Sequence, residues 1–215
     1  MPVITISRLY GAGGETVGLM LARRLNAEFL GPDLIDLVAH RLELPKEEVE
    51  AVDEQPTSFL NRLLLALGAA NPEPPVDTET KAWTPPYADP QLDPRRAVLE
   101  HTQEVIREAA RSGNVVILGR GAAYILHELE GALHVFLRAD EPVRAKVIME
   151  REHVSEDDAR RRAKQTDENR RAYVRQVYGH TWDLPGHYDV VLDTGRLGYE
   201  AATEAILAAL KGRSK

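Results

Sequence analysis

A glycine-rich stretch near the N-terminus constrains the fold more than any other part of the sequence. Before it, Val3 to Ile6 form a short apolar and β-branched run, which is the pattern of a strand buried in a parallel sheet. The stretch itself reads "SRLYGAGGET" over residues 7–16. After it, apolar residues recur at helical spacing at Val17, Met20, Leu21 and Leu25. A strand, a glycine loop and a helix in this order predict backbone N–H groups and a helix N-terminus that face an anion.

Strands and helices continue to alternate along the chain. Further strands are expected at residues 28–30, 115–118, 133–137 and 188–193. Helices are expected over residues 31–42, from Pro45, over 56–67, from Pro94 to Gly113, over 142–151, from the capping box at Ser155, and over 199–211. Helices between strands predict a three-layer α/β fold with a mainly parallel five-stranded sheet. In such sheets ligands bind beyond the carboxyl ends of the strands, where loops 8–16, 119–121 and 193–196 are expected to lie.

One region interrupts this alternation. Residues 69–95 are rich in proline and are expected to form an irregular insertion, which is a lid, a binding loop or a disordered segment. Trp83 and Tyr87 are expected to pin this insertion to the core. A chain of 215 residues is long enough for a single domain over residues 1–215, with the insertion and an arginine-rich lid region at about 152–182.

The composition excludes several classes of function. The chain has no cysteine, so it forms no disulfides and no thiolate metal site, and a reducing compartment is compatible with it. A net charge of -7 argues against binding to nucleic-acid polymers, which takes a basic face. The sequence "MPVITISRLY" lacks a basic leader, and no later run approaches the roughly 20 apolar residues of a membrane span. We therefore expect a cytoplasmic protein without a membrane partner.

The glycine loop departs from the Walker A pattern G-x-x-x-x-G-K-[ST], in which backbone N–H groups wrap phosphates, a lysine adds charge and a hydroxyl holds Mg²⁺. With Gly13 aligned to the second glycine, Arg8 stands at the first glycine, Gly14 at the lysine and Glu15 at the hydroxyl position. The guanidinium of Arg8 could replace the lysine near the β- and γ-phosphates. The alternatives are a solvent-exposed Arg8 and a purely structural glycine turn.

Several blocks of the sequence together resemble the cytidylate kinase-like proteins, a branch of the P-loop nucleoside monophosphate kinases whose loop reads roughly I-S-R-x-x-G-S-G-G. The blocks are "VITISRLYGAGGETVGLMLARRL", "FLGPDLID", "NVVILGRGAAYIL", "LHVFLRADEPVRAKVI", "TDENRRAYVRQVYGHTW" and "YDVVLDTGRLG". The resemblance covers nearly the whole chain except the proline-rich insertion. It implies a P-loop kinase-type fold with a helical lid, and in this family the missing lysine is part of the pattern.

The resemblance also implies how the acceptor is bound. Arg120 matches the arginine of the G-R-D element, which approaches the acceptor nucleotide, whereas Gly121 replaces the aspartate of that element. Glycines on both sides of Arg120 would allow a ligand to approach closely. Asp33 falls where these kinases place an aspartate near the acceptor and is a candidate substrate-binding residue. A carboxylate in the first turn of a helix explains Asp33 almost as well.

Asp167 and Arg170 match a D-x-x-R spacing in the lid of cytidylate kinases, where arginines close over the transferring phosphoryl group. Arg170 or Arg171 would then stabilise the transferring charge. The alternative is a solvated arginine face paired with the acidic residues 156–158, and we prefer it for residues 160–162.

These observations favour an ATP-dependent phosphotransferase of the nucleoside monophosphate kinase type that acts on CMP, dCMP or a related small acceptor. The predicted phosphate-binding residues are Gly11, Ala12, Gly13, Gly14, Glu15 and Thr16. The predicted catalytic residues are Arg8, Arg120, Arg170 and Arg171. Mg²⁺ would bridge the donor phosphates, with Glu15 or Thr16 as its protein contact. The alternatives are a nucleotide-binding regulatory module without turnover and a structural domain that binds no nucleotide. The oligomeric state is left open.

Overall fold

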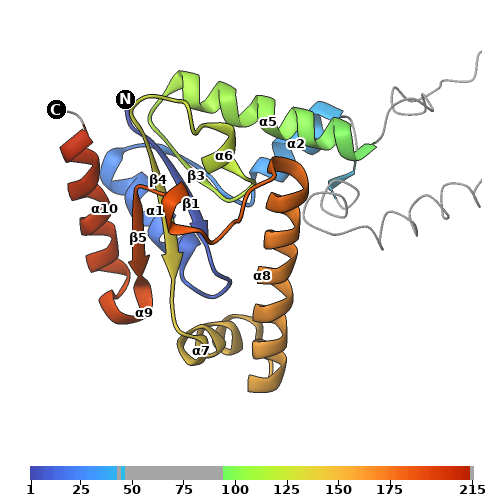
Figure 1. Ribbon diagram of the computed structural model, residues 1–215, viewed down its shortest axis with the longest axis vertical. Helices are drawn as coiled ribbons and strands as arrows, with labels where there is room; N and C mark the ends of the chain where they lie inside the picture. The colour runs from blue at the N-terminus through green and yellow to red at the C-terminus, as the bar shows by residue number, and fades with distance from the viewer. Residues whose placement is uncertain (43–44, 47–93, 214–215) are drawn as a thin grey trace, which may run out of the picture.

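Figure 1 shows the computed structural model, which describes residues 1–42, 45–46 and 94–213. The helices expected from Pro45 and over residues 56–67 lie outside the described residues, except for positions 45 and 46. The proline-rich insertion, including Trp83 and Tyr87, also lies outside them, except for positions 94 and 95.

The described residues form a five-stranded parallel sheet with the strand order β2-β3-β1-β4-β5. The strands are β1 (Val3–Arg8), β2 (Glu28–Leu30), β3 (Val115–Leu118), β4 (Ala132–Arg138) and β5 (Val190–Asp193). Strand β1 lies at the centre of the sheet. It pairs Ile6 with Leu118 of β3 and Arg8 with Leu137 of β4, so the carboxyl ends of these three strands lie at the same end of the sheet. This arrangement confirms the predicted α/β class and the five predicted strands.

Helices cover both faces of the sheet (Figure 1). The longer helices are α1 (Gly14–Leu25), α2 (Leu34–Leu42), α5 (Pro94–Ser112), α7 (Glu141–Glu152), α8 (Glu156–Tyr178) and α10 (Tyr199–Arg213). The short ones are α6 (Ala122–Ile125), the 3₁₀ turn η2 (Pro185–His187) and α9 (Thr194–Leu197). Helices α1 and α10 pack on one face, where Ile4 and Ile6 point. Helices α2, α5 and α6 pack on the other, where Val3 points. Both faces of β1 are therefore buried, as its continuous apolar run predicts.

Helices α7 and α8 leave the sheet after β4 and pack against each other beyond the carboxyl ends of the strands (Figure 1). The Ser155 side chain caps α8 by accepting a hydrogen bond from the N–H of Asp158, as the capping-box pattern predicts. Strand β5 begins at Val190, two residues later than expected. Before it, the Tyr188 N–H donates to the Pro185 C=O of η2, and Asp189 is hydrogen-bonded to the backbone of His134. Within the described residues, none of the helices combines the length and hydropathy that a membrane span needs.

His134 of β4 is a titratable side chain that lies inside the fold and is 8% exposed. Its Nδ1 atom lies 2.8 Å from the Thr5 hydroxyl of β1. Burial lowers the pKa of His134 below its ordinary value of 6.5, although the nearby Asp189 carboxylate opposes the shift. The folded protein therefore favours the neutral imidazole.

We expect this burial to make the protein sensitive to acid. Below the unfolded pKa near 6.5, the unfolded chain binds a proton that the folded His134 resists, so stability falls as the pH falls. For one proton the slope approaches about 1.4 kcal/mol per pH unit. Urea unfolding between pH 5 and 8 should show a shallower dependence in His134→Gln than in the wild type. The exposed His153→Gln serves as the control, and identical slopes in the wild type and His134→Gln would contradict the prediction.

Candidate functional site

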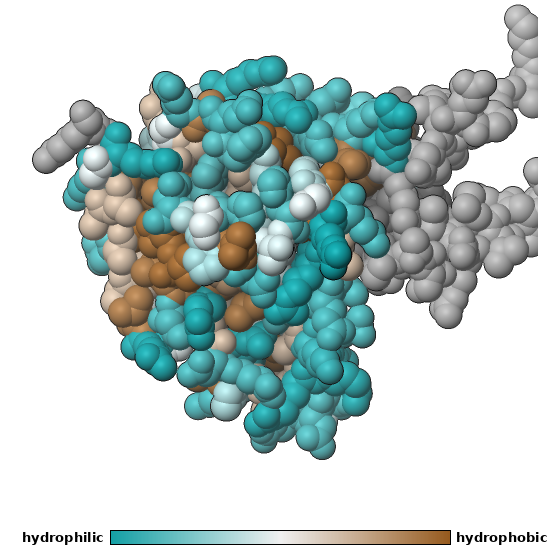
Figure 2. Space-filling view, viewed as in Figure 1, coloured by the Kyte–Doolittle hydropathy of each residue, from teal (hydrophilic) through white to brown (hydrophobic). Residues whose placement is uncertain are grey.

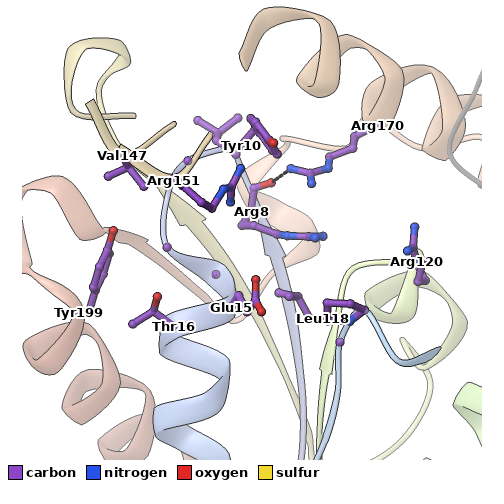
Figure 3. A pocket seen from close by; sticks show the side chains of 16 residues that line it. Arg8, Tyr10, Glu15, Thr16, Leu118, Arg120, Val147, Arg151, Arg170 and Tyr199 are labelled. Carbon is purple, nitrogen blue, oxygen red and sulfur yellow. Dashed lines mark hydrogen bonds between the residues drawn. The ribbon is translucent and has the colours of Figure 1, made fainter. Parts of the chain in front are cut away.

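A pocket of about 220 Å³ lies at the carboxyl ends of β1 and β3 (Figure 3). Its walls come from six places: the loop after β1 with the start of α1, the β2–α2 connection, the β3–α6 turn, α7, α8 and the start of α10. The predicted loops 8–16 and 119–121 thus meet at one pocket. The third predicted loop, 193–196, forms the end of β5 and most of α9, and none of its residues lines this pocket. Tyr199, at the start of α10, lines the pocket instead.

The glycine loop leads into the first turn of α1 at this pocket. Gly13 adopts a left-handed conformation, with φ 73°, and begins α1 without a side-chain cap. The first helical hydrogen bond runs from Val17 N–H to Gly13 C=O, at 3.0 Å. The N–H groups of residues 14–16 precede that bond and, as in any first helical turn, have no partner within the helix. A first helical turn of this kind can bind an anion, as the predicted phosphate-binding role of the loop requires.

Arg8, the last residue of β1, fills the space that two glycines leave open. A Cβ atom on Gly14 would lie 2.7 Å from the Cγ atom of Arg8, so the arginine side chain crosses the face of Gly14. A Cβ atom on Gly119 would lie 2.2 Å from Nη1 of Arg8, so the guanidinium ends over the β3–α6 turn. The arginine thus runs past the position that carries the Walker A lysine, in the middle of the pocket (Figure 3).

The β3–α6 turn holds Arg120 in a strained conformation. Gly119, Arg120 and Gly121 all have positive φ angles, of 79°, 56° and 71°, and Arg120 lacks the freedom that glycine has there. Such strain tends to occur where a side chain must be held toward a ligand. A Cβ atom on Gly121 would lie 2.4 Å from the Tyr178 ring, so the ring occupies the place of the aspartate in the G-R-D element.

The pocket is strongly cationic. Four arginines line it, and Glu15 is the one acidic residue among its described lining residues. These arginines are Arg8, Arg120, Arg151 and Arg170. The side chain of Glu15 points toward Arg8 and Arg151 (Figure 3), and its charge acts on Arg151. The carboxylate therefore sits among cations, which offsets its repulsion of a bound phosphate.

Tyr10 organises one wall of the pocket. Its ring lies 4.8 Å from the guanidinium carbon of Arg151 and 5.5 Å from that of Arg170, both distances measured to the ring centroid. Its hydroxyl donates a hydrogen bond to Glu152. Burial would raise the pKa of Glu152, but hydrogen bonds from Arg151, Tyr10 and Arg162 lower it to about 2. Glu152 is therefore an anion that holds Arg151 in place.

The two candidate arginines of α8 have different surroundings. Arg170 lines the pocket, its side chain is 10% exposed, and its Nη1 donates a hydrogen bond to the Arg8 C=O at 3.0 Å. Arg171 lies outside this pocket and donates to Asp183 at 3.0 Å. Arg160 and Arg161 pair with Glu156 and Asp158 of the predicted acidic group, whereas Arg162 pairs with Glu152 of α7.

The candidate acceptor residue Asp33 is exposed and is not part of the pocket lining, although its neighbours Gly31 and Pro32 are. Its backbone C=O accepts a hydrogen bond from the N–H of Leu37, so Asp33 lies directly before α2, in which Asp36 is the acidic residue of the first turn.

The oxygen atoms available to a metal are few. Among the residues that the structure describes, no cluster of three or more His, Cys, Asp and Glu side chains could hold a metal ion. Glu15 and Thr16 line the pocket, and Thr16 points toward the Tyr199 end (Figure 3). Such a set fits Mg²⁺, which usually takes one or two protein oxygens together with substrate phosphates.

Sequence reasoning missed Tyr10, Val147, Arg151 and Tyr199 as lining residues. Arg151 and Val147 lie four residues apart on α7, where one helix face points into the pocket. That spacing was a usable signal, but the sequence does not show which face of α7 meets the loop.

The fold and the site together define a P-loop kinase architecture, and the comparisons with known proteins agree. A crystal structure of an uncharacterized protein from Eubacterium ventriosum superimposes with a TM-score of 0.69 at 21% identity, covering 98% of this chain and 99% of that one. Shikimate kinase from Bacteroides thetaiotaomicron gives a TM-score of 0.53 at 16% identity, with 97% of each chain covered. At these identities the likeness concerns the fold.

The chain belongs to the cytidylate kinase-like family, whose model matches residues 3–196. It is 31% identical over 112 residues to a protein named cytidylate kinase from Methanopyrus kandleri, and 32% identical over 106 residues to one from Methanococcus vannielii. Each match covers 48% of this chain, and 58% and 61% of the two relatives. The chain thus matches less than two thirds of the length of these relatives.

The path of Arg8 leads to a prediction about Gly14. Replacing Gly14 with lysine restores the Walker A residue in the sequence, but the new Cβ would lie 2.7 Å from Cγ of Arg8 and would displace it. We therefore expect Gly14→Lys to bind ATP more weakly, by about tenfold or more, and to lower the melting temperature. Calorimetric titration with ATP and thermal denaturation measure the two effects.

Gly14→Ala tests the added Cβ alone and should lower the melting temperature in the same direction. The control is Gly186→Ala, because a Cβ atom at Gly186 meets nothing within 4 Å. Tighter ATP binding by Gly14→Lys than by the wild type would contradict the assigned role of Arg8.

Proposed function

We propose that this protein is an ATP-dependent phosphotransferase of the nucleoside monophosphate kinase type, which phosphorylates CMP, dCMP or a related small acceptor. The observation that carries the proposal is the path of Arg8 across Gly14 to Gly119. It puts a permanent cation beside the helix N-terminus, where the Walker A lysine would otherwise be. Membership of the cytidylate kinase-like family supports the same reaction class.

The polarity of the pocket suggests how the two substrates lie. From Tyr199 and Thr16 at one end, the pocket runs past Arg8 to Leu118 and Arg120 at the other (Figure 3). The aromatic end would border the donor base, and residues 11–16 would wrap the donor phosphates. Arg120, beside the β2–α2 connection, would hold the acceptor phosphate.

Phosphoryl transfer depends mainly on positioning and charge neutralisation. An oxygen of the acceptor phosphate forms a bond to the γ-phosphorus, while the bond from that phosphorus to the bridging oxygen breaks and ADP leaves. Arg8 and Arg170 would stabilise the charge on the transferring group from two sides. Mg²⁺, held by Glu15 or Thr16 together with the donor phosphates, would neutralise further phosphate charge.

A coupled assay that detects ADP, run with ATP, Mg²⁺ and each nucleoside monophosphate in turn, tests the proposed reaction. We expect turnover with CMP or dCMP, because the family resemblance points to a cytidine acceptor. Tight ATP binding without transfer to any acceptor would support the alternative of a regulatory module. A protein whose melting temperature responds to neither ATP, CMP nor phosphate would be a structural domain.

Arg8→Ala tests the cation directly. Removing a charged donor that acts on the transferring group should lower kcat/KM by on the order of 100-fold. Arg8→Lys should recover part of this loss, because it keeps the charge without the planar fork. The assay is the same coupled assay, with ATP affinity measured in parallel.

Arg161→Ala is the matched control, because Arg161 lies on α8 with a side chain that is 72% exposed and pairs with Asp158. Its activity should equal that of the wild type. Unchanged kcat/KM and ATP affinity in Arg8→Ala would refute the role of Arg8.

A further inference from the structure

The backbone of the phosphate loop is held by a buried carboxylate from a distant part of the chain. Asp167 of α8 has a side chain that is 5% exposed. Its Oδ1 atom accepts a hydrogen bond from the Tyr10 N–H at 2.8 Å. Its Oδ2 atom accepts one from Nη1 of Arg144 at 2.8 Å. Both oxygens of the carboxylate are thus engaged around one residue of the loop.

Arg144 of α7 completes a closed ring of hydrogen bonds around Tyr10. The same Nη1 group that contacts Asp167 also donates to the Tyr10 C=O at 3.0 Å. The N–H and the C=O of Tyr10 are therefore both fixed from outside the loop, one by α8 and the other by α7. The side chain of Arg144 is 12% exposed, so water competes little for these bonds.

Two further contacts tie the same helices to the loop. One helical turn beyond Asp167, Arg170 donates to the Arg8 C=O. A Cβ atom on Gly11 would lie 2.8 Å from the backbone oxygen of Arg144, so α7 lies directly against the loop. The loop is thus held at residues 8, 10 and 11. These are the residues that lead into the N–H groups at the start of α1.

We propose that Asp167 is a positioning residue that fixes the conformation of the phosphate loop and thereby couples the α7–α8 pair to phosphate binding. Asp167 acts through the Tyr10 peptide groups and Arg144 and does not contact the phosphate itself. The coupling rests on the proposed function, because it assigns the loop a phosphate to bind. It also gives Asp167 of the D-x-x-R spacing a role that differs from closing a lid.

The chemistry of the ring requires a carboxylate. Asp167 receives hydrogen bonds from two donors on opposite oxygens, and an ionised carboxylate is an acceptor at both. Asparagine keeps one acceptor but presents an NH₂ group at the other position, where it would face the Arg144 guanidinium. Charge-assisted hydrogen bonds of this kind are the stronger ones, and a buried cation left without its partner destabilises its surroundings.

Hydrogen exchange of the loop and ATP affinity, measured on the full chain, test the proposal. In Asp167→Asn we expect the amides of residues 8–14 to exchange about tenfold faster or more than in the wild type, and ATP·Mg²⁺ to bind about tenfold more weakly. Arg144→Lys, which keeps the charge but loses the guanidinium geometry, should move both readouts in the same direction. It also serves as the decisive variant if Asp167→Asn does not fold.

Thr5→Val is the matched control. It also removes a buried hydrogen bond, the one between Thr5 and His134, but that bond lies within the sheet and does not contact the loop. It should lower the melting temperature but leave loop exchange and ATP affinity as in the wild type. Wild-type loop exchange in Asp167→Asn, or an equal loop effect in Thr5→Val, would overturn the proposal.

The two readouts separate this inference from the proposed function. If the wild type binds neither ATP nor inorganic phosphate, the proposed function fails, and loop exchange alone still decides whether Asp167 orders the loop. If ATP binds and loop exchange is unchanged in both ring variants, the proposed function stands and the positioning role of Asp167 is refuted.

Discussion

The site depends on the space that Arg8 occupies between two glycines. The side chain passes Gly14 and ends over Gly119, and at both places a Cβ atom would be too close to it. One constraint therefore links the end of β1, the start of α1 and the turn after β3. It also explains why the lysine position of the loop holds a glycine: the cation enters from the strand, so the helix must leave room for it.

The positive charge of the pocket comes from the local placement of arginines and is not apparent from the overall composition. The chain has a net charge of -7, yet the pocket combines four arginines with the single carboxylate of Glu15 among its described lining residues. Tyr10 and Glu152 hold Arg151 toward the interior of the pocket, while Arg170 is anchored to the loop backbone. Cations that are already held in place lose little conformational entropy when an anion binds, which favours tight binding.

The sequence predicts the sheet and the loop well because both depend on local patterns. Apolar runs mark the strands, and positive φ angles at Gly13 and Gly119 are supplied by the residue type best suited to them. The contacts of α7 were not predictable in the same way. Arg144 contacts the loop and Arg151 lines the pocket, whereas some other charged residues of α7 do neither. Which residues of α7 face the loop depends on how the helix packs, and this is a property of the tertiary structure. Asp33 illustrates the opposite error: the sequence suggests a substrate-binding residue, but Asp33 is exposed and does not line the pocket, although its neighbours do.

Two departures from the common kinase patterns are each matched by a side chain that uses the vacated space. Gly14 stands in the lysine position and Arg8 crosses it; Gly121 stands in the aspartate position and the Tyr178 ring packs against it. In each case the missing Cβ atom lets the neighbouring side chain lie where it does, so the glycine and that side chain form one packing unit. The identity of residues 14 and 121 is therefore tied to the positions of Arg8 and Tyr178, and a larger residue at either place would have to displace its neighbour.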